Sequence, residues 1–327
     1  MKLIDTHFHL DFYRDHKFWY DRINELEQYL LDHFPLRDTF RTLKAKYNFD
    51  IMQMLDNNGI YYDNNHIFKL NYPYNKNSVK KFKGHVEKVQ ALLNKDNKVY
   101  MMLVPDKNYY VNDESFLKLD YEQMKKEVTF KNISSIDIFD DLSLDDYYYT
   151  DSHFKQIALF DVVETMSKVM NFQVQDFEYE YHKFDEFYGV YYGESALDFK
   201  PDTITYVTNE ILDQAEVAYL ENKDLKTIYN EDNLHSLDPY EVFLDGASSI
   251  ITIENKQSLN DKELIIFRDS FASSLTPLLV PYYSKITVLD NRYITLDLIK
   301  DYVEFKNQDV LLMYSCTMVN DCGSLKN

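Results

Sequence analysis

Four short and almost uninterrupted apolar runs limit the possible folds of this chain more than any other feature of its sequence. A run that is apolar at successive positions suits a strand covered on both faces, as in a parallel sheet. The first such run stops at Pro105, which cannot continue a ladder of backbone hydrogen bonds. The runs are Val99-Tyr100-Met101-Met102-Leu103-Val104, Leu264-Ile265-Ile266-Phe267, Ile286-Thr287-Val288-Leu289 and Val310-Leu311-Leu312-Met313-Tyr314.

Helical patterns alternate with these runs. We expect helices over 24–47 with a break at Pro35, over 77–94, after Phe154, within 270–283 and over 294–305. A hairpin is expected over 59–70 and a further strand over 133–139. Strands and helices in alternation predict an α/β fold, with a parallel sheet flanked by helices on both faces.

The region 172–262 differs from the rest of the chain, because it is richer in short β-like pieces and turns. We expect it to be a β-rich insertion that leaves the main sheet. The whole chain, 1–327, is then expected to form a single α/β domain with this insertion inside it.

Composition excludes several classes of function. The 327 residues carry a formal charge of -20, so the surface repels nucleic acid and makes a polyanionic glycan a poor substrate. With 29 Tyr and 22 Phe the chain is too rich in apolar rings to be disordered. No apolar run approaches the ~20 residues that span a bilayer, and no signal peptide is visible. Cys316 and Cys322 are compatible with two free thiols or, in an exported protein, with a small disulfide loop.

Ser270 is the strongest candidate for chemistry. The segment Arg268-Asp269-Ser270-Phe271 follows an apolar strand and opens a helix. Ligands of open α/β sheets bind at the carboxyl ends of strands. The unpaired N–H groups of a helix start suit a developing oxyanion. The alternative is that Ser270 only caps the helix.

A serine hydroxyl needs a base, and His153 is the best placed histidine. It lies in a loop just before a helix, with Asp151 close enough to be presented by the same loop. A carboxylate there would fix the imidazole tautomer and stabilise the imidazolium. The alternative is that Asp151 caps the following helix and His153 is a surface residue.

The sequence around His153 resembles a motif of a known protein family. Tyr148-Tyr149-Thr150-Asp151-Ser152-His153-Phe154 resembles the name-giving motif of the DHHW protein family, which is related to the alginate O-acetyltransferases and to SGNH hydrolases. The resemblance runs from about Tyr29 to the C-terminus. Its other segments are Phe34-Pro35-Leu36-Arg37-Asp38, Val104-Pro105-Asp106-Lys107, Phe187-Tyr188-Gly189, Lys200-Pro201-Asp202-Thr203-Ile204, Arg268-Asp269-Ser270-Phe271 and Leu289-Asp290-Asn291-Arg292-Tyr293.

This resemblance implies an SGNH hydrolase-like domain that transfers acetyl groups to a bacterial polysaccharide outside the cytoplasm, without a cofactor. Ser270 becomes the nucleophile, His153 the general base and Asp151 its orienting partner. A membrane acyltransferase is the donor that the resemblance suggests, and a leader or anchor is expected outside this chain. The residues implied to contact substrate are Arg292, Tyr293, Phe154 and Tyr149.

Two other functions remain open on the same residues. If water replaces the sugar hydroxyl, the protein is a carbohydrate acetylesterase. A non-catalytic glycan-binding protein is the other alternative, since Ser152, Phe154 and Lys155 stand where the family usually has His, Trp and Thr. None of these changes removes a member of the triad. Phe154 keeps an aromatic ring but lacks the indole N–H donor.

A second resemblance points to metal chemistry. Ile4-Asp5-Thr6-His7-Phe8-His9-Leu10 looks like the opening strand of TatD-type metal-dependent hydrolases. A metal site needs further ligands at suitable strand ends. The other histidines do not supply them, so we expect no metal.

Overall fold

The computed structural model describes residues 35–258 and 260–327. Its contacts divide the chain into two compact units, Met1–Met54 and Leu55–Asn327. The described part of the first unit consists mainly of helix α2 (Arg37–Lys46) and a following helical turn, Tyr47–Ile51. A single domain over 1–327 stays a prediction. Of the predicted helix 24–47, the part before residue 35 lies outside the described residues.

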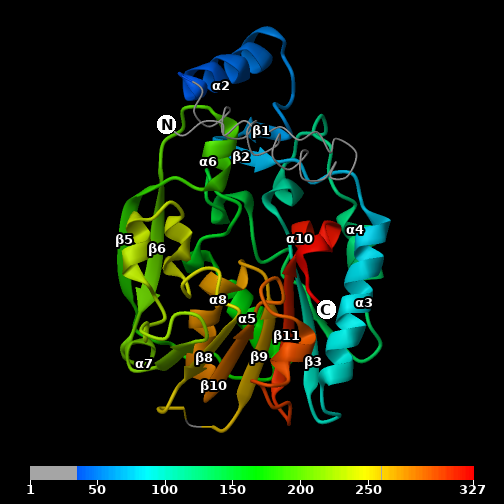
Figure 1. The fold of residues 1–327 in the computed structure, drawn as a ribbon, viewed down its shortest axis with the longest axis vertical. Coiled ribbons are helices and arrows are strands. Elements are labelled where there is room, and N and C mark those ends of the chain that lie inside the picture. Colours follow the sequence, from blue (N-terminus) through cyan, green and yellow to red (C-terminus); the bar gives the residue numbers. More distant parts are fainter. Residues whose placement is uncertain (1–34, 259) are drawn as a thin grey trace, which may run out of the picture. The chain divides into compact units, whose positions relative to one another are not determined.

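Within the described residues, the second unit contains a central seven-stranded sheet in the order β4-β3-β11-β9-β10-β8-β7 (Figure 1). The strands from β4 to β10 in this order run parallel, and β8 and β7 are antiparallel to their neighbours. The predicted apolar runs form β3, β9, β10 and β11. The bounds are β3 (Lys98–Val104), β4 (Ser134–Ile136), β7 (Glu216–Tyr219), β8 (Ile250–Glu254), β9 (Glu263–Arg268), β10 (Lys285–Leu289) and β11 (Asp309–Ser315).

The region 172–262 does not leave the main sheet as expected. Its strands β5 (Glu180–Phe187) and β6 (Asp202–Thr208) form a separate antiparallel pair, but β7 and β8 extend the central sheet. The reason is visible in β8, where Ile250, Ile251 and Ile253 are all buried. A strand that is apolar on both faces must be covered on both faces, and in the central sheet Ile250 enters one core while Ile251 and Ile253 enter the other. The sheet is therefore mixed rather than parallel throughout.

Helices cover both faces of the sheet, as the alternating pattern predicted. On one face, α3 (Lys76–Leu92), α4 (Tyr121–Glu127) and α9 (Leu296–Ile299) share a core with the strands. On the other face, α5 (Phe160–Met170) and α8 (Ala272–Leu279) share a second core. Successive residues of β11 enter opposite cores, Leu311 and Met313 one and Val310 and Leu312 the other, because strand side chains alternate.

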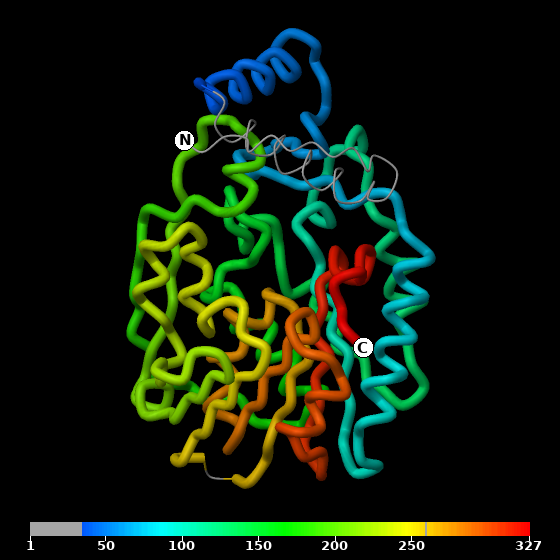
Figure 2. The backbone as a smooth tube through the Cα atoms, in the orientation of Figure 1, coloured from blue at the N-terminus to red at the C-terminus, as the bar shows by residue number. Residues whose placement is uncertain are grey.

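Smaller elements complete the unit. The predicted hairpin is β1 (Ile60–Asp63) with β2 (His66–Lys69), and its turn places Asn64 and Asn65 at positive φ. Short helices are α6 (Val190–Ser195), α7 (Glu210–Asp213) and α10 (Cys316–Asn320). Figure 2 shows how the C-terminal strand, in red, lies among segments from distant parts of the sequence. This arrangement brings the carboxyl ends of β3, β9, β10 and β11 to one edge of the sheet.

Candidate active site

Ser270 lies at the carboxyl end of β9, in the turn that leads into α8. Asp269 fixes this turn to the neighbouring strand, since its carboxylate accepts the N–H of Phe271 at 3.1 Å and that of Ser315 at 2.7 Å. Helix α8 has no side-chain cap, and its N-cap position is Phe271. The alternative role of Ser270 as a helix cap is therefore not what the structure shows. Its side chain remains half-buried and bonds elsewhere.

The Ser270 hydroxyl bonds to His153. Its Oγ lies 2.8 Å from Nε2 of the imidazole, although 117 residues separate the two in sequence. The other ring nitrogen, Nδ1, lies 2.6 Å from Oδ1 of Asp151. An ionised carboxylate only accepts hydrogen bonds, so Nδ1 carries the proton. Nε2 is then left to accept a hydrogen bond from the Ser270 hydroxyl, as a general base must.

Asp151 is fully buried and has several donors around its carboxylate. Oδ1 also accepts the N–H of His153 at 2.9 Å, and Oδ2 accepts that of Val190 at 3.0 Å. Burial by itself raises the pKa of Asp151, but the charge and hydrogen bonds of His153 and the Val190 N–H lower it to about 2. Asp151 is therefore ionised at neutral pH. The next helical turn, Gln156–Ala158, has Lys155 at its N-cap, so Asp151 does not cap it.

The flat face of His153 rests on Tyr240. The two rings are stacked, with centroids 3.8 Å apart and planes 7° from parallel. The Tyr240 hydroxyl donates to Ser274 Oγ at 2.9 Å, which ties it to the helix that follows Ser270. The Phe271 ring packs beside the same imidazole, with the two ring centroids 4.8 Å apart. Sequence reasoning missed Tyr240, because it lies in the region 172–262 and no local motif marks it.

Two of the predicted substrate contacts are accessible aromatic side chains. The side chain of Tyr149 is 39% exposed and that of Tyr293 is 45% exposed. Phe154, by contrast, is fully buried and packs against Phe271 and Tyr147. It cannot reach a substrate, because the aromatic ring fills a core position next to His153. We therefore correct the expectation for Phe154 to a packing role.

Arg292 is placed at the same sheet edge as Ser270, because β10 pairs with β9 up to Leu289 and Phe267. Its guanidinium forms a two-point bond with Asp290, at 2.9 Å from Nε and 2.6 Å from Nη2. Burial lowers the pKa of Arg292, but the hydrogen bonds and charge of Asp290 raise it above the ordinary value. Arg292 is therefore a fixed cation, with its side chain 20% exposed.

Arg268, the last residue of β9, does not face the solvent. Its side chain is fully buried, donating to Ser273 Oγ and, at 3.0 Å, to the Gly246 carbonyl. It also lies 3.9 Å from Asp290. This arginine connects the start of α8 to the neighbouring loops.

Other predicted features fall outside the site. In the described ranges no group of three or more His, Cys, Asp or Glu side chains could hold a metal ion, and His7 and His9 lie outside those ranges. Cys316 and Cys322 are buried free thiols. Within residues 35–258 and 260–327, no helix is both long and apolar enough to cross a bilayer.

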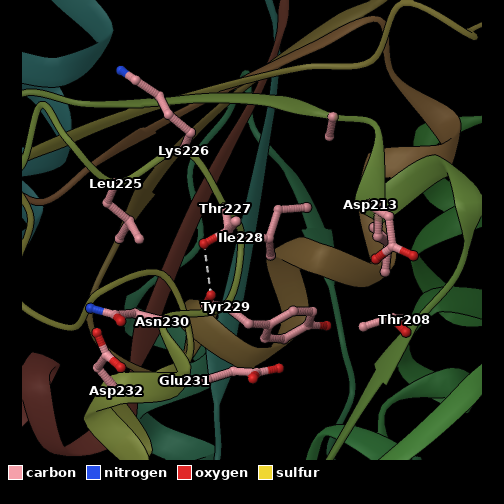
Figure 3. Close-up of a pocket in the computed structure, with 12 residues that line it drawn as sticks. Thr208, Asp213, Leu225, Lys226, Thr227, Ile228, Tyr229, Asn230, Glu231 and Asp232 are labelled. Carbon is pink, nitrogen blue, oxygen red and sulfur yellow. Dashed lines mark hydrogen bonds between the residues drawn. The ribbon is translucent and has the colours of Figure 1, made fainter.

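A separate pocket of about 410 Å³ lies where β6 ends and α7 begins (Figure 3). Thr208, Asp213, Tyr229 and Glu231 are among the residues that line it. The Tyr229 hydroxyl donates to the Val207 carbonyl at 2.8 Å. None of the three residues of the Ser270 site lines this pocket, so we do not connect it with the chemistry.

Solved structures of other proteins share the fold of this chain. No protein-family profile and no curated protein matches the chain. Among solved structures, a DHHW family protein from Eubacterium siraeum is similar, with 19% identity and a TM-score of 0.67, over 81% of this chain and 93% of that protein. Bacillus cereus PatB1 with a sulfonyl adduct has 17% identity and a TM-score of 0.62, over 82% of this chain and 100% of PatB1. The resemblance to the DHHW family therefore extends to the three-dimensional fold, which this chain shares with a member of that family.

Proposed function

We propose that this protein transfers acetyl groups to hydroxyls of a bacterial polysaccharide through Ser270, His153 and Asp151. One observation carries the proposal: the continuous hydrogen-bonded chain from the Ser270 hydroxyl through His153 to the buried Asp151 carboxylate. This is the arrangement that activates a serine for acyl transfer. The sulfonyl adduct of PatB1 supports it, because sulfonyl reagents attach to activated nucleophiles.

In the first half-reaction, Ser270 Oγ attacks the carbonyl carbon of the acetyl donor and passes its proton to His153 Nε2. Asp151 stabilises the resulting imidazolium. The Ser270 N–H, at the start of α8, is the donor that we assign to the oxyanion. When the tetrahedral intermediate collapses, the leaving group takes the proton from Nε2. The acetyl group is then an ester of Ser270.

In the second half-reaction, a sugar hydroxyl gives its proton to His153 Nε2 and attacks the acetyl ester. Nε2 then returns the proton to Ser270 Oγ, and the acetylated sugar leaves. Water in place of the sugar gives the alternative, an acetylesterase. Arg292, Tyr149 and Tyr293 are the residues that we assign to substrate contacts, since each is fixed or accessible. The charge of -20 favours an acceptor that is not polyanionic.

The polysaccharide acceptor and the extracytoplasmic place of action rest on the family resemblance. A membrane acyltransferase is the donor that we assign on the same basis. Mass spectrometry of neutral glycan oligomers, incubated with the protein and an acetyl donor, tests the acceptor. We expect products heavier by one acetyl group. Release of free acetate alone would favour the esterase.

The Ser270→Ala variant tests the chemistry itself. Hydrolysis of p-nitrophenyl acetate should fall by at least about 10³-fold, because the nucleophile is lost while the fold is kept. Ser134→Ala is the matched control, since Ser134 is exposed on β4 at the edge of the sheet. A folded Ser270→Ala protein with full activity would contradict the proposal. A wild type that binds glycan and hydrolyses nothing would favour the non-catalytic alternative.

A further inference from the structure

The backbone just before Asp151 is held by a buried lysine. Lys107 Nζ donates to the carbonyl of Tyr148 at 2.9 Å and to that of Tyr149 at 3.2 Å. Lys107 follows β3, and only 1% of its surface is exposed. Its ammonium also lies 5.3 Å from the centres of the Phe68 and Tyr191 rings. The lysine thus reaches the loop from the end of the central sheet.

A buried carboxylate holds the same peptide groups through their N–H side. Asp202, the first residue of β6, accepts the N–H of Tyr149 at 2.7 Å and that of Thr150 at 2.8 Å. It also accepts the Thr150 hydroxyl at 2.6 Å. Asp202 is 3% exposed. Lys107 donates to the carbonyl oxygens of these two peptide groups, and Asp202 accepts from their N–H groups. Each peptide group is therefore hydrogen-bonded on both sides.

Thr150 carries this restraint to the catalytic carboxylate. Its hydroxyl accepts the Gly189 N–H at 2.9 Å, and its carbonyl accepts that of Tyr191 at 3.1 Å. Val190, which lies between Gly189 and Tyr191, donates its N–H to the Asp151 carboxylate at 3.0 Å. The restraints on Thr150 and on Asp151 therefore come from the same turn.

Burying two ionisable side chains, Lys107 and Asp202, stabilises the fold less than apolar packing would. Burial lowers the pKa of Lys107, and the charges of Asp151 and Asp202 raise it by less. The net pKa is about 7. Apolar side chains of similar volume often stabilise a fold better than buried charges do. What the charged pair supplies instead is directional hydrogen bonding to successive peptide groups, which apolar packing cannot provide.

We propose that Lys107 and Asp202 are positioning residues, which we call the loop clamp, and that they hold Asp151 and His153 in the orientation that Ser270 requires. This inference rests on the function proposed above. Neither residue contacts the reacting atoms, and both act through the 148–151 backbone. A displacement of about 1 Å in such a site can lower the rate about 100-fold. The loop clamp therefore acts on turnover and not on the identity of the catalytic groups.

The test compares Lys107→Met and Asp202→Asn with matched controls on neighbouring elements. One control is Lys69→Met on β2, which removes an exposed ion pair with Glu194. The other is Asp185→Asn on β5, which removes an exposed hydrogen bond with Thr203. One readout is p-nitrophenyl acetate hydrolysis per folded molecule. The second is the far-downfield proton resonance of the His153–Asp151 hydrogen bond.

We expect both clamp variants to hydrolyse the ester about 10- to 100-fold more slowly, with the downfield resonance weakened or lost. The controls should stay within about twofold of wild type, as exposed substitutions usually do. A clamp variant that melts earlier but keeps its rate and its resonance would show a merely structural role and overturn the inference. If both clamp variants fail to fold, Thr150→Val removes one hydroxyl from the same network, and an unchanged rate and resonance there would overturn it as well.

Failure of the proposed function is distinguishable from failure of the loop clamp. A wild type that shows no hydrolysis contradicts the proposed function. If its downfield resonance is nevertheless present, and is lost in the clamp variants, the positioning of His153 and Asp151 is supported. If the wild type hydrolyses the ester and the clamp variants match it, the proposed function stands and the loop clamp is refuted.

Discussion

The His153 imidazole has a different partner on each side of the ring. Asp151 fixes the proton on Nδ1, Ser270 occupies Nε2 and Tyr240 covers the flat face. The first contact sets the tautomer, the second sets the direction of proton transfer, and the third sets the plane of the ring. The imidazole is thus held in one tautomer and one orientation, which is what the proposed role of His153 as general base requires.

At the residue scale, the lowered pKa of Asp151 predicts how the stability of the protein changes at acid pH. This pKa is lowered from the ordinary value of 3.8 to about 2, so folding favours the ionised form. The corresponding stabilisation is present above pH 4 and is lost as the pH falls toward 2; its size is roughly 2 kcal/mol. Urea unfolding of wild type and Asp151→Asn should therefore give free-energy curves that converge between pH 4 and 2. Curves that stay parallel over this pH range would contradict this role.

At the scale of elements, the turn from β5 into α6 lies very close to Asp151 at Gly189. A Cβ at this position would lie 2.2 Å from Cβ of Asp151 and 2.5 Å from its Cα, so any side chain must displace the loop. In α6 itself, a Cβ at Gly193 would meet nothing within 4 Å. We expect Gly189→Ala to lower ester hydrolysis about 100-fold and Gly193→Ala to leave it within about twofold. Equal rates in the two folded variants would show that this close approach is not needed.

Sequence patterns predicted elements where one signal dominates. Long apolar runs predicted β3, β9, β10 and β11, and helical spacing over 77–94 predicted α3. The edge strand β7 and its neighbour β8 were missed, since antiparallel strands this short also resemble pieces of a separate insertion. The helix expected over 294–305 is reduced to α9, because Asp301 onward turns away from helical geometry.

At the scale of the whole unit, the sheet brings together residues that the sequence keeps apart. Ser270, His153 and Asp151 could be named as candidate site residues from the sequence, and a parallel sheet explained why Ser270 lies at a strand end. Distances could not be predicted, because they depend on how a loop after β4 packs against the turn after β9. For the same reason Lys107 and Asp202 appeared only as parts of motifs, and Tyr240 did not appear at all.

Covalent labelling of Ser270 tests the central claim most directly. We expect phenylmethylsulfonyl fluoride to add one sulfonyl group per molecule, located by peptide mass spectrometry on Ser270, because this hydroxyl is bonded to an imidazole that a buried carboxylate orients. The labelling should disappear in Ser270→Ala and slow by about 100-fold or more in His153→Ala, and Ser134→Ala should react like wild type. A label on another residue, or labelling of Ser270 that does not depend on His153, would contradict the account.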